Sequence, residues 1–378
     1  MIRITLRLVL VFFMSISIDS YAQQKRARDY GIEIGVLKTG QNNAITDIEG
    51  VRVGHTTLII GDSIRTGVTA ILPHPGNIFD FKVPAAVYIG NGYGKLAGYS
   101  QVKELGNIET PVILTNTLSV PVASDALITY TLNQNENVYS VNPIVGETND
   151  GWLNEIRGRH VTQEDVLKAI QNAKEGPVEE GNVGAGTGTI CFGYKGGIGT
   201  ASRVLPKADG GYTIGILVQT NFGGVFEING VPIDKELNPS KHKGLYDVDG
   251  SCMMVVITDA PLNSRNLERL AKRAMMGLAK TGGIASNGSG DYVIALSAAK
   301  ENLIPNSGDS MFNTKKELRN DAMSPLFLAT IEATEEAILN SLFAAETMVG
   351  RDGHEIKSLP IDEIIRTMKK YNKIVTDH

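Results

Sequence analysis

Short apolar runs bounded by turn-forming residues limit the folds open to this chain of 378 residues more than any other feature. Its 41 glycines gather at the ends of these runs, where they permit tight turns and close approaches between backbones. β-Branched and apolar runs with such boundaries are typical of strands. The sequence therefore predicts strands over residues 51–60, 85–89, 112–115, 188–192, 212–219, 252–258 and 292–298.

Between these strands, four segments place apolar residues three and four positions apart, which is the period of an amphipathic helix. The predicted helices cover residues 120–132, 162–172, 267–279 and 325–343. Strand runs interleaved with paired helices favour stacked sheets covered by helices over a regular alternation of strand and helix. With 42% hydrophobic residues the chain can fill such a core. We expect an α+β protein.

The first 22 residues have the pattern of a targeting segment. Arg3 and Arg7 form a basic start, residues 8–18 are mostly apolar, and Ser20-Tyr21-Ala22 offers a small-residue cleavage site. We expect residues 1–22 to be a signal peptide and the mature protein to be exported, either periplasmic or secreted. An uncleaved membrane anchor is the alternative, and no later stretch approaches the roughly 20 apolar residues that span a bilayer.

Charge and cysteine content argue against several classes of partner. The net charge of −5 is spread along the chain without a basic stripe, so we expect no nucleic-acid partner. Cys191 and Cys252 lie in apolar runs, which favours buried free thiols, with one disulfide as the alternative. Neither they nor the six histidines show metal-ligand spacing, and we expect no metal and no cofactor.

A polar segment runs directly into a buried strand at Gly250-Ser251. Residues 232–250 are rich in Lys, Asp, His, Pro and Gly, the composition of an exposed loop, where a chain break is tolerated. Gly250 can adopt strained or left-handed geometry and leave its carbonyl open to the neighbouring Ser251 hydroxyl. A cut there would free an α-amine with a pKa of about 8, able to act as base for its own hydroxyl. An ordinary turn before a strand is the alternative.

Three further groups of residues could support such a nucleophile. Ser289 and Asp291 stand just before a predicted strand and can form a hydrogen-bonded pair that orients or receives a proton. Asn221 ends another predicted strand and can present its amide to a developing oxyanion. Glu147 could bind a substrate's ammonium group, with Trp152 as an apolar wall. Each of these groups also has a structural explanation, as a turn or a solvated loop.

Ordered stretches along nearly the whole mature chain carry a family resemblance. They are Ile45-Thr46-Asp47, Gly50-Val51-Arg52-Val53-Gly54-His55, Gly67-Val68-Thr69-Ala70, Asn91-Gly92-Tyr93-Gly94, Thr115-Asn116-Thr117, Val145-Gly146-Glu147-Thr148 and Gly181-Asn182-Val183-Gly184-Ala185-Gly186-Thr187-Gly188. With the segments above, they resemble the P1 family of serine aminopeptidases, peptidase family S58. This group contains the L-aminopeptidase/D-amidase-esterase enzymes and the β-peptidyl aminopeptidases.

The resemblance implies a single catalytic domain with a four-layer αββα sandwich, similar to the N-terminal-nucleophile hydrolases. It also implies self-processing into an α chain, residues 23–250, and a β chain, residues 251–378. The family tends to form assemblies of such processed heterodimers, so a homo-oligomer of αβ units is expected.

By position, the resemblance also implies roles for the candidate residues. Ser251 matches the nucleophile, Asn221 the oxyanion-stabilising amide, and Glu147 the residue that binds the substrate's amino group. Ser289 and Asp291 match the pair that supports the nucleophile, although the β-peptidyl branch carries Glu at the position of Asp291. The shorter side chain keeps the charge and changes its reach.

The sequence thus predicts a serine aminopeptidase that releases N-terminal residues from short peptides, amides or esters through an acyl-enzyme. Pocket size is not encoded in these motifs, so L-, D- and β-residues all stay open as substrates. An acyltransferase of similar architecture is one alternative. An exported peptide-binding protein that has lost catalysis is the other.

Overall fold

The computed structural model describes residues 25–237, 250–308 and 310–374. The expected signal peptide, residues 1–22, lies outside these ranges, as does most of the polar segment before Ser251, residues 238–249. Within the described ranges, no helix combines the length and the apolar character that crossing a membrane requires.

Two mixed sheets form the centre of the molecule. The first sheet has the order β1 (Arg52–Ile60), β2 (Ile64–Leu72), β6 (Val112–Asn116), β7 (Ile144–Thr148) and β4 (Leu96–Ala97). The second has the order β10 (Ile198–Val204), β11 (Thr213–Asn221), β14 (Gly250–Thr258), β15 (Ser289–Ser297), β3 (Phe81–Gly92) and β16 (Ile304–Pro305), with β5 (Asn107–Ile108) also paired to β3. Short hairpins pair β8 (Ile190–Cys191) with β9 (Tyr194–Lys195), β12 (Glu227–Ile228) with β13 (Val231–Pro232), and β17 (Met348–Val349) with β18 (Glu355–Ile356).

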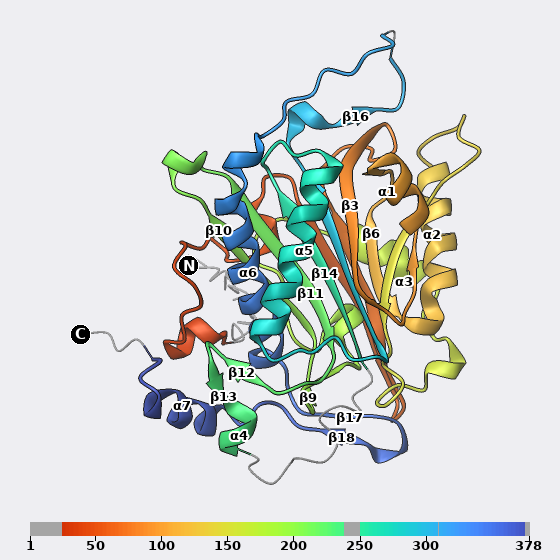
Figure 1. Cartoon of the computed structure of the whole chain (residues 1–378). Helices are drawn as coiled ribbons and strands as arrows, with labels where there is room; N and C mark the ends of the chain where they lie inside the picture. The colour runs from red at the N-terminus through yellow and green to blue at the C-terminus, as the bar shows by residue number, and fades with distance from the viewer. Residues whose placement is uncertain (1–24, 238–249, 309, 375–378) are drawn as a thin grey trace, which may run out of the picture.

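Helices cover the outer faces of both sheets (Figure 1). Helices α2 and α3 pack on the first sheet, and α5 and α6 pack on the second. The helices are α1 (Tyr99–Leu105), α2 (Val120–Leu132), α3 (Gln163–Gln171), α4 (Ile233–Leu237), α5 (Ser264–Lys280), α6 (Ser324–Phe343) and α7 (Ile361–Lys370). The order of layers is helix, sheet, sheet, helix, so the expected α+β fold with an αββα sandwich is confirmed.

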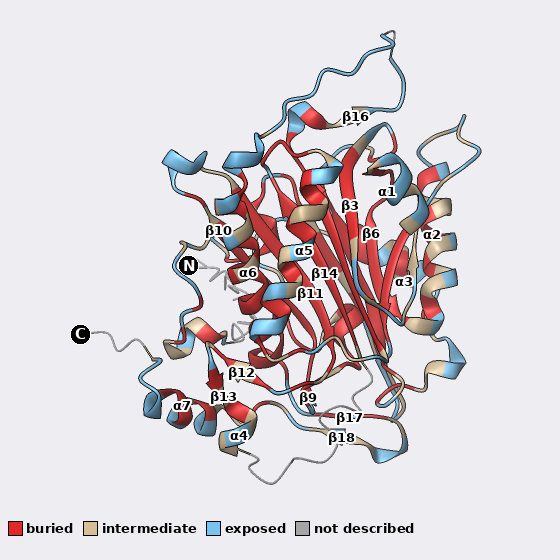
Figure 2. Ribbon diagram, in the orientation of Figure 1, coloured by how far each residue is buried: buried red, intermediate tan, exposed pale blue. Residues whose placement is uncertain are grey.

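Three apolar cores separate the four layers, and the buried strands between the helices are visible in Figure 2. The middle core joins the two sheets, for example through Leu114 from β6 and Val255 from β14. The outer cores join each sheet to its own helices. A strand such as β14 therefore buries both faces, which explains its unbroken apolar run.

Strand β14 is the element that positions the candidate nucleophile. It runs antiparallel to β11 and parallel to β15. In this register Ser251 stands beside Asn221 on one side and Gly290 on the other. Strand β11 precedes the proposed cut and β15 follows it, so both proposed chains contribute to a single sheet.

The predicted helices match α2, α3, α5 and α6 to within three residues at each end. Strands β2, β7 and β10 were not predicted as strands. The strand predicted over residues 188–192 is wrong in extent, since only Ile190–Cys191 pairs there. A Cβ at Gly188 would lie 2.1 Å from the Arg65 carbonyl oxygen. Gly188 therefore packs closely against the backbone of β2 and is not part of a strand.

Candidate active site

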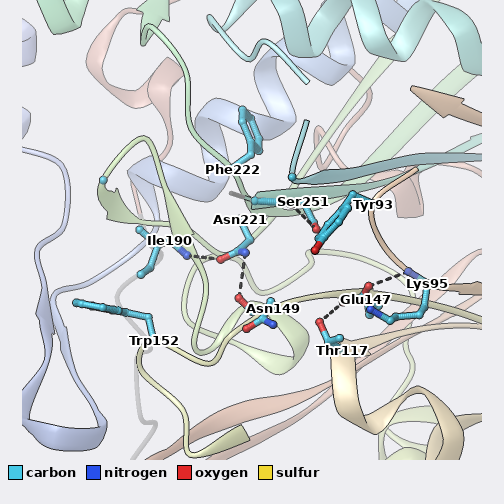
Figure 3. Close-up of a pocket in the computed structure, with 13 residues that line it drawn as sticks. Tyr93, Lys95, Thr117, Glu147, Asn149, Trp152, Ile190, Asn221, Phe222 and Ser251 are labelled. Carbon is cyan, nitrogen blue, oxygen red and sulfur yellow. Dashed lines mark hydrogen bonds between the residues drawn. The ribbon is translucent and has the colours of Figure 1, made fainter. Parts of the chain in front are cut away.

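A cavity of about 560 Å³ opens where β11, β14 and the loop after β7 meet (Figure 3). Four of the residues singled out in the sequence, Glu147, Trp152, Asn221 and Ser251, line it together with Gly250. The other lining residues are Tyr93, Lys95, Thr117, Asn149, Ile190, Gly193, Phe222 and Gly288.

Ser251 places its hydroxyl at the floor of this cavity. Its Oγ donates to the Gly250 carbonyl oxygen at 2.6 Å and accepts from the Gly290 amide at 3.3 Å. A Cβ at Gly290 would lie 3.1 Å from this Oγ and 2.9 Å from the Tyr93 carbonyl oxygen. Glycine at position 290 therefore leaves room for the hydroxyl, which contacts the carbonyl of the peptide bond before it.

Gly250 is required for space and not for backbone freedom. It is the first residue of β14, and its φ does not lie in the left-handed region, so the expectation of left-handed geometry is wrong. A Cβ there would lie 2.6 Å from both the Asn221 carbonyl oxygen and Phe222 Cα. Only glycine allows β11 and β14 to approach this closely next to Ser251.

Asn221 is held in one orientation by two backbone groups. Its Oδ1 accepts from the Ile190 amide at 2.9 Å, and its Nδ2 donates to the Asn149 carbonyl at 3.0 Å (Figure 3). Because an amide nitrogen carries two hydrogens, one donor is left for a group bound in the cavity. Asn221 is the register partner of Ser251, and both residues line the cavity.

Asp150, the residue after Asn149, and Lys195 are buried ionisable groups that interact with each other. Burial raises the pKa of Asp150 to about 7, against hydrogen bonds that lower it. Burial lowers the pKa of Lys195 to about 7, and the nearby Asp150 opposes this shift. Lys195 Nζ donates to the carbonyls of Gly186 and Gly196 at 2.9 and 2.8 Å. It therefore links the glycine-rich segment that contains Gly186 to Gly196.

Glu147 lies on the side of Ser251 opposite to Trp152 (Figure 3). Its Oε1 accepts from the Lys95 amide at 2.9 Å, and its Oε2 accepts from the Thr117 hydroxyl. The carboxylate is buried, with 3% of its residue surface exposed, yet it lines the cavity. The two contacts hold this carboxylate in one orientation at the cavity wall.

Ser289 and Asp291 do not line this cavity. The sequence places them before a strand, but β15 begins at Ser289 and includes both. Asp291 pairs in register with Cys252, whose side chain packs in the core beneath α5 and α6. Because neighbouring residues of a strand face opposite sides, Ser289 and Asp291 lie behind the sheet face that carries Ser251.

Asp291 is an unpaired buried carboxyl group. Burial raises its pKa to about 6, and the Ser289 hydroxyl and Cys252 amide oppose this rise. Neither carboxylate oxygen makes a hydrogen bond of normal geometry to any part of the chain that the structure describes, and the same holds for Ser289 Oγ. Shifted pKa values of this kind gather at functional sites.

Sequence reasoning missed several cavity residues, among them Tyr93, Thr117 and Asn149. Tyr93 and Thr117 lie inside stretches that carry the family resemblance, which is the signal that could have identified them. Asn149 acts through its backbone carbonyl, which no residue pattern reveals. Among the described residues, no group of three His, Cys, Asp or Glu side chains is placed to hold a metal ion. Cys191 and Cys252 are buried and unpaired.

The layered fold and a cavity built around a serine at the second position of β14 define a serine hydrolase with the N-terminal-nucleophile fold. The model of peptidase family S58 matches residues 43–356. The chain belongs to peptidase family S58, and it is an enzyme that hydrolyses peptide bonds as an aminopeptidase.

Individual relatives agree with this family. The β-peptidyl aminopeptidase BapA of Sphingosinicella microcystinivorans is 40% identical over 93% of this chain and 94% of its own. The PH0078 protein of Pyrococcus horikoshii OT3 superposes with a TM-score of 0.86 and 50% identity, covering 92% of this chain and 99% of its own. The L-aminopeptidase D-Ala-esterase/amidase of Ochrobactrum anthropi gives a TM-score of 0.85 and 36% identity, covering 93% and 99%.

Proposed function

We propose that the chain cuts itself between Gly250 and Ser251 and then uses Ser251 as the nucleophile of its aminopeptidase reaction. The observation that carries this proposal is the contact of 2.6 Å between Ser251 Oγ and the Gly250 carbonyl oxygen. Attack of this hydroxyl on the Gly250 carbonyl carbon would form an ester and break the bond from that carbon to the Ser251 nitrogen, which takes up the hydroxyl proton. Water would then cleave the ester and release a new chain that begins with Ser251.

In the mature enzyme, the freed α-amine of Ser251 takes the proton from its own hydroxyl as Oγ attacks the substrate's first carbonyl. The spare Nδ2 hydrogen of Asn221 stabilises the oxyanion. The amine returns its proton to the leaving group, and water hydrolyses the acyl-enzyme. Glu147 binds the substrate's free amino group, which limits cleavage to the first residue.

Ser289 and Asp291 act on the new amine in this proposal. The peptide nitrogen of Ser251 follows Gly250, whose partner in register is Ser289. After the cut, the amine therefore begins its strand beside Ser289, with the Asp291 carboxyl group behind it. A carboxyl group whose pKa is raised to about 6 can accept or share a proton near neutral pH.

We propose short peptides, amino-acid amides and esters as substrates. The names of the relatives add two particular classes, β-peptides and D-alanine esters or amides. A panel of amides that differ only in the first residue would rank L-, D- and β-residues. We also propose export after removal of residues 1–22, and assembly of the processed αβ units into a homo-oligomer.

Substitution Ser251→Ala tests the proposal, because it removes the hydroxyl and keeps the fold of β14. We expect an intact chain on mass spectrometry and no turnover of an amino-acid p-nitroanilide. The unsubstituted protein should give two fragments that meet at Gly250-Ser251. Ser307→Ala changes an exposed serine and should process and turn over normally. A stable intact chain with full activity would contradict self-processing.

A further inference from the structure

We propose that Trp152 forms a subsite for the leaving-group side of the substrate, and that His354 on the β17–β18 hairpin holds Trp152 in position. The subsite would take aromatic or other flat apolar amines. This inference rests on the proposed function, because the direction of the substrate follows from the roles of Glu147 and Ser251.

The direction follows from the layout of the cavity. In Figure 3, Glu147 and Trp152 lie on opposite sides of Ser251 and Asn221. A substrate whose amino group binds Glu147 and whose first carbonyl meets Ser251 must continue away from Glu147. The group after the scissile bond is thereby directed toward Trp152.

The surface at that end of the cavity suits a flat apolar group. Trp152 has 52% of its surface exposed and lines the cavity with Ile190. An exposed indole face beside an aliphatic side chain offers stacking area without a charge to satisfy. Glu147, by contrast, offers a carboxylate at the other end. The two ends of the cavity therefore differ in chemistry. The carboxylate end suits the substrate's amino group, and the indole end suits its leaving group.

His354 packs directly against the indole. The two rings are stacked, with centroids 4.0 Å apart and planes 10° from parallel. His354 Nδ1 also lies 2.9 Å from the Trp152 carbonyl oxygen, so it donates a hydrogen bond to the same residue whose ring it covers. One face of the indole is thus occupied by the histidine, and the ring is held at a fixed angle to the cavity.

The rest of the hairpin fixes the backbone on both sides of Trp152. Arg351 Nε donates to the Gly151 carbonyl at 2.9 Å, and the Arg351 amide donates to the Leu153 carbonyl at 2.8 Å. A Cβ at Gly350 would lie 2.1 Å from that Leu153 oxygen, so glycine permits the close approach. The hairpin contacts three consecutive residues of the loop, which makes it a positioning element for the subsite.

The kinetic test compares two amides that share their first residue and differ in the leaving group, an anilide and an unsubstituted amide. For Trp152→Ala and His354→Ala we expect KM for the anilide to rise about 3- to 10-fold, as the loss of an aromatic contact implies. KM for the unsubstituted amide should change less than about 2-fold. His354→Phe keeps a stacking ring and should restore most of the anilide KM. Equal losses for both amides would overturn the subsite.

A spectroscopic test is independent of catalysis, because Trp152 is the single tryptophan of the chain. His354→Ala should change its emission, whereas His160→Ala, which removes a histidine bound to Glu155, should not. Unchanged emission in His354→Ala would overturn the positioning role.

Aniline, the leaving group itself, should quench Trp152 emission at concentrations that leave free tryptophan unaffected. Quenching without hydrolysis of either amide would support the subsite and contradict the proposed function. Hydrolysis of both amides without quenching by aniline would support the proposed function and overturn the subsite.

Discussion

Two buried polar regions of this molecule differ in whether their acidic side chains form ion pairs. In the ion network, Arg203 binds Glu332 at 3.1 Å and Glu336 at 2.6 Å, and Arg28 binds Glu336 at 2.6 Å. Behind the cavity, Asp291 is buried without such a partner among the described residues. Both regions lie next to apolar cores, so burial alone does not separate them.

The pKa values show the difference. Burial pushes the pKa of Glu336 upward, but Arg28 and Arg203 outweigh it and hold that pKa below its usual value. Burial also raises the pKa of Asp291, and there the opposing contacts are too weak to cancel it. Removing one partner of a buried ion pair leaves an uncompensated charge and destabilises the fold, whereas a carboxyl group buried without a partner is retained at a cost in stability. The ion network therefore has the pattern of a structural element, and Asp291 has the pattern expected of the supporting role proposed for it.

The position of the network supports this assignment. Glu332 and Glu336 belong to α6, which follows Ser251 in the chain, whereas Arg28 and Arg203 precede it. After the proposed cut, these ion pairs would join the two chains through the core. The network would thus hold the enzyme together once the covalent link is lost.

Removing Arg203 should give the largest effect. Arg203→Ala leaves the buried Glu332 carboxylate without its arginine and leaves Glu336 with Arg28 alone. We expect a loss of about 3–5 kcal/mol in the free energy of unfolding. Denaturant unfolding measures it. The control is the double variant Arg203→Met with Glu336→Leu, which removes charges of both signs and should lose less. A single variant as stable as the double would contradict the structural role of the network.

Asn221→Ala should lower the reaction rate strongly and stability moderately. It leaves the Ile190 amide and the Asn149 carbonyl without this side chain, which costs about 1–3 kcal/mol. Loss of one oxyanion donor costs about 100- to 1,000-fold in kcat, or roughly 3–4 kcal/mol of transition-state stabilisation. Steady-state kinetics on a p-nitroanilide checks this, with Asn229→Ala as the control because its side chain binds the Glu33 carbonyl at the surface. A fall in stability comparable to that of Arg203→Ala would show that Asn221 mainly stabilises the fold and would contradict its proposed role in the reaction.

Asp291→Asn should lower activity and raise stability, the reverse of a structural residue. Because the folded pKa of about 6 exceeds the unfolded value of about 3.9, the native state holds its proton more tightly. Stability is therefore lost as pH rises between these values. Asparagine removes that loss, so we expect a gain of about 3 kcal/mol near pH 8 and none near pH 3.

Unfolding curves at the two pH values measure this difference. Asp291→Glu tests the effect of side-chain length. It keeps the carboxyl group and should therefore retain more activity than Asp291→Asn. A stability gain that is equal at both pH values would show that the charge is not its cause.

Much of the fold could be predicted from local pattern, because the apolar run after Ser251 and the spacing in α6 each reflect burial of a single element. Pairing between distant elements could not. The register that places Asn221 beside Ser251 depends on strand order, which periodicity does not encode. The resemblance implied the four layers and the roles of the two residues. The sequence suggested that glycine is needed at position 250 for its backbone freedom. The structure shows that glycine is needed there because Asn221 and Phe222 leave no space for a side chain. The stack of Trp152 on His354 joins residues 202 positions apart and has no local signal.

The smallest effect is expected at the surface, where Lys300 pairs with Glu49 at 2.8 Å with side chains 71% and 82% exposed. The pKa of Glu49 is lowered by this contact, as that of Glu336 is by its arginines. Water screens the surface pair, so Lys300→Ala should leave the unfolding midpoint unchanged within experimental scatter. A loss approaching that of Arg203→Ala would show that pairing, and not burial of the pair, sets the energy of the ion network.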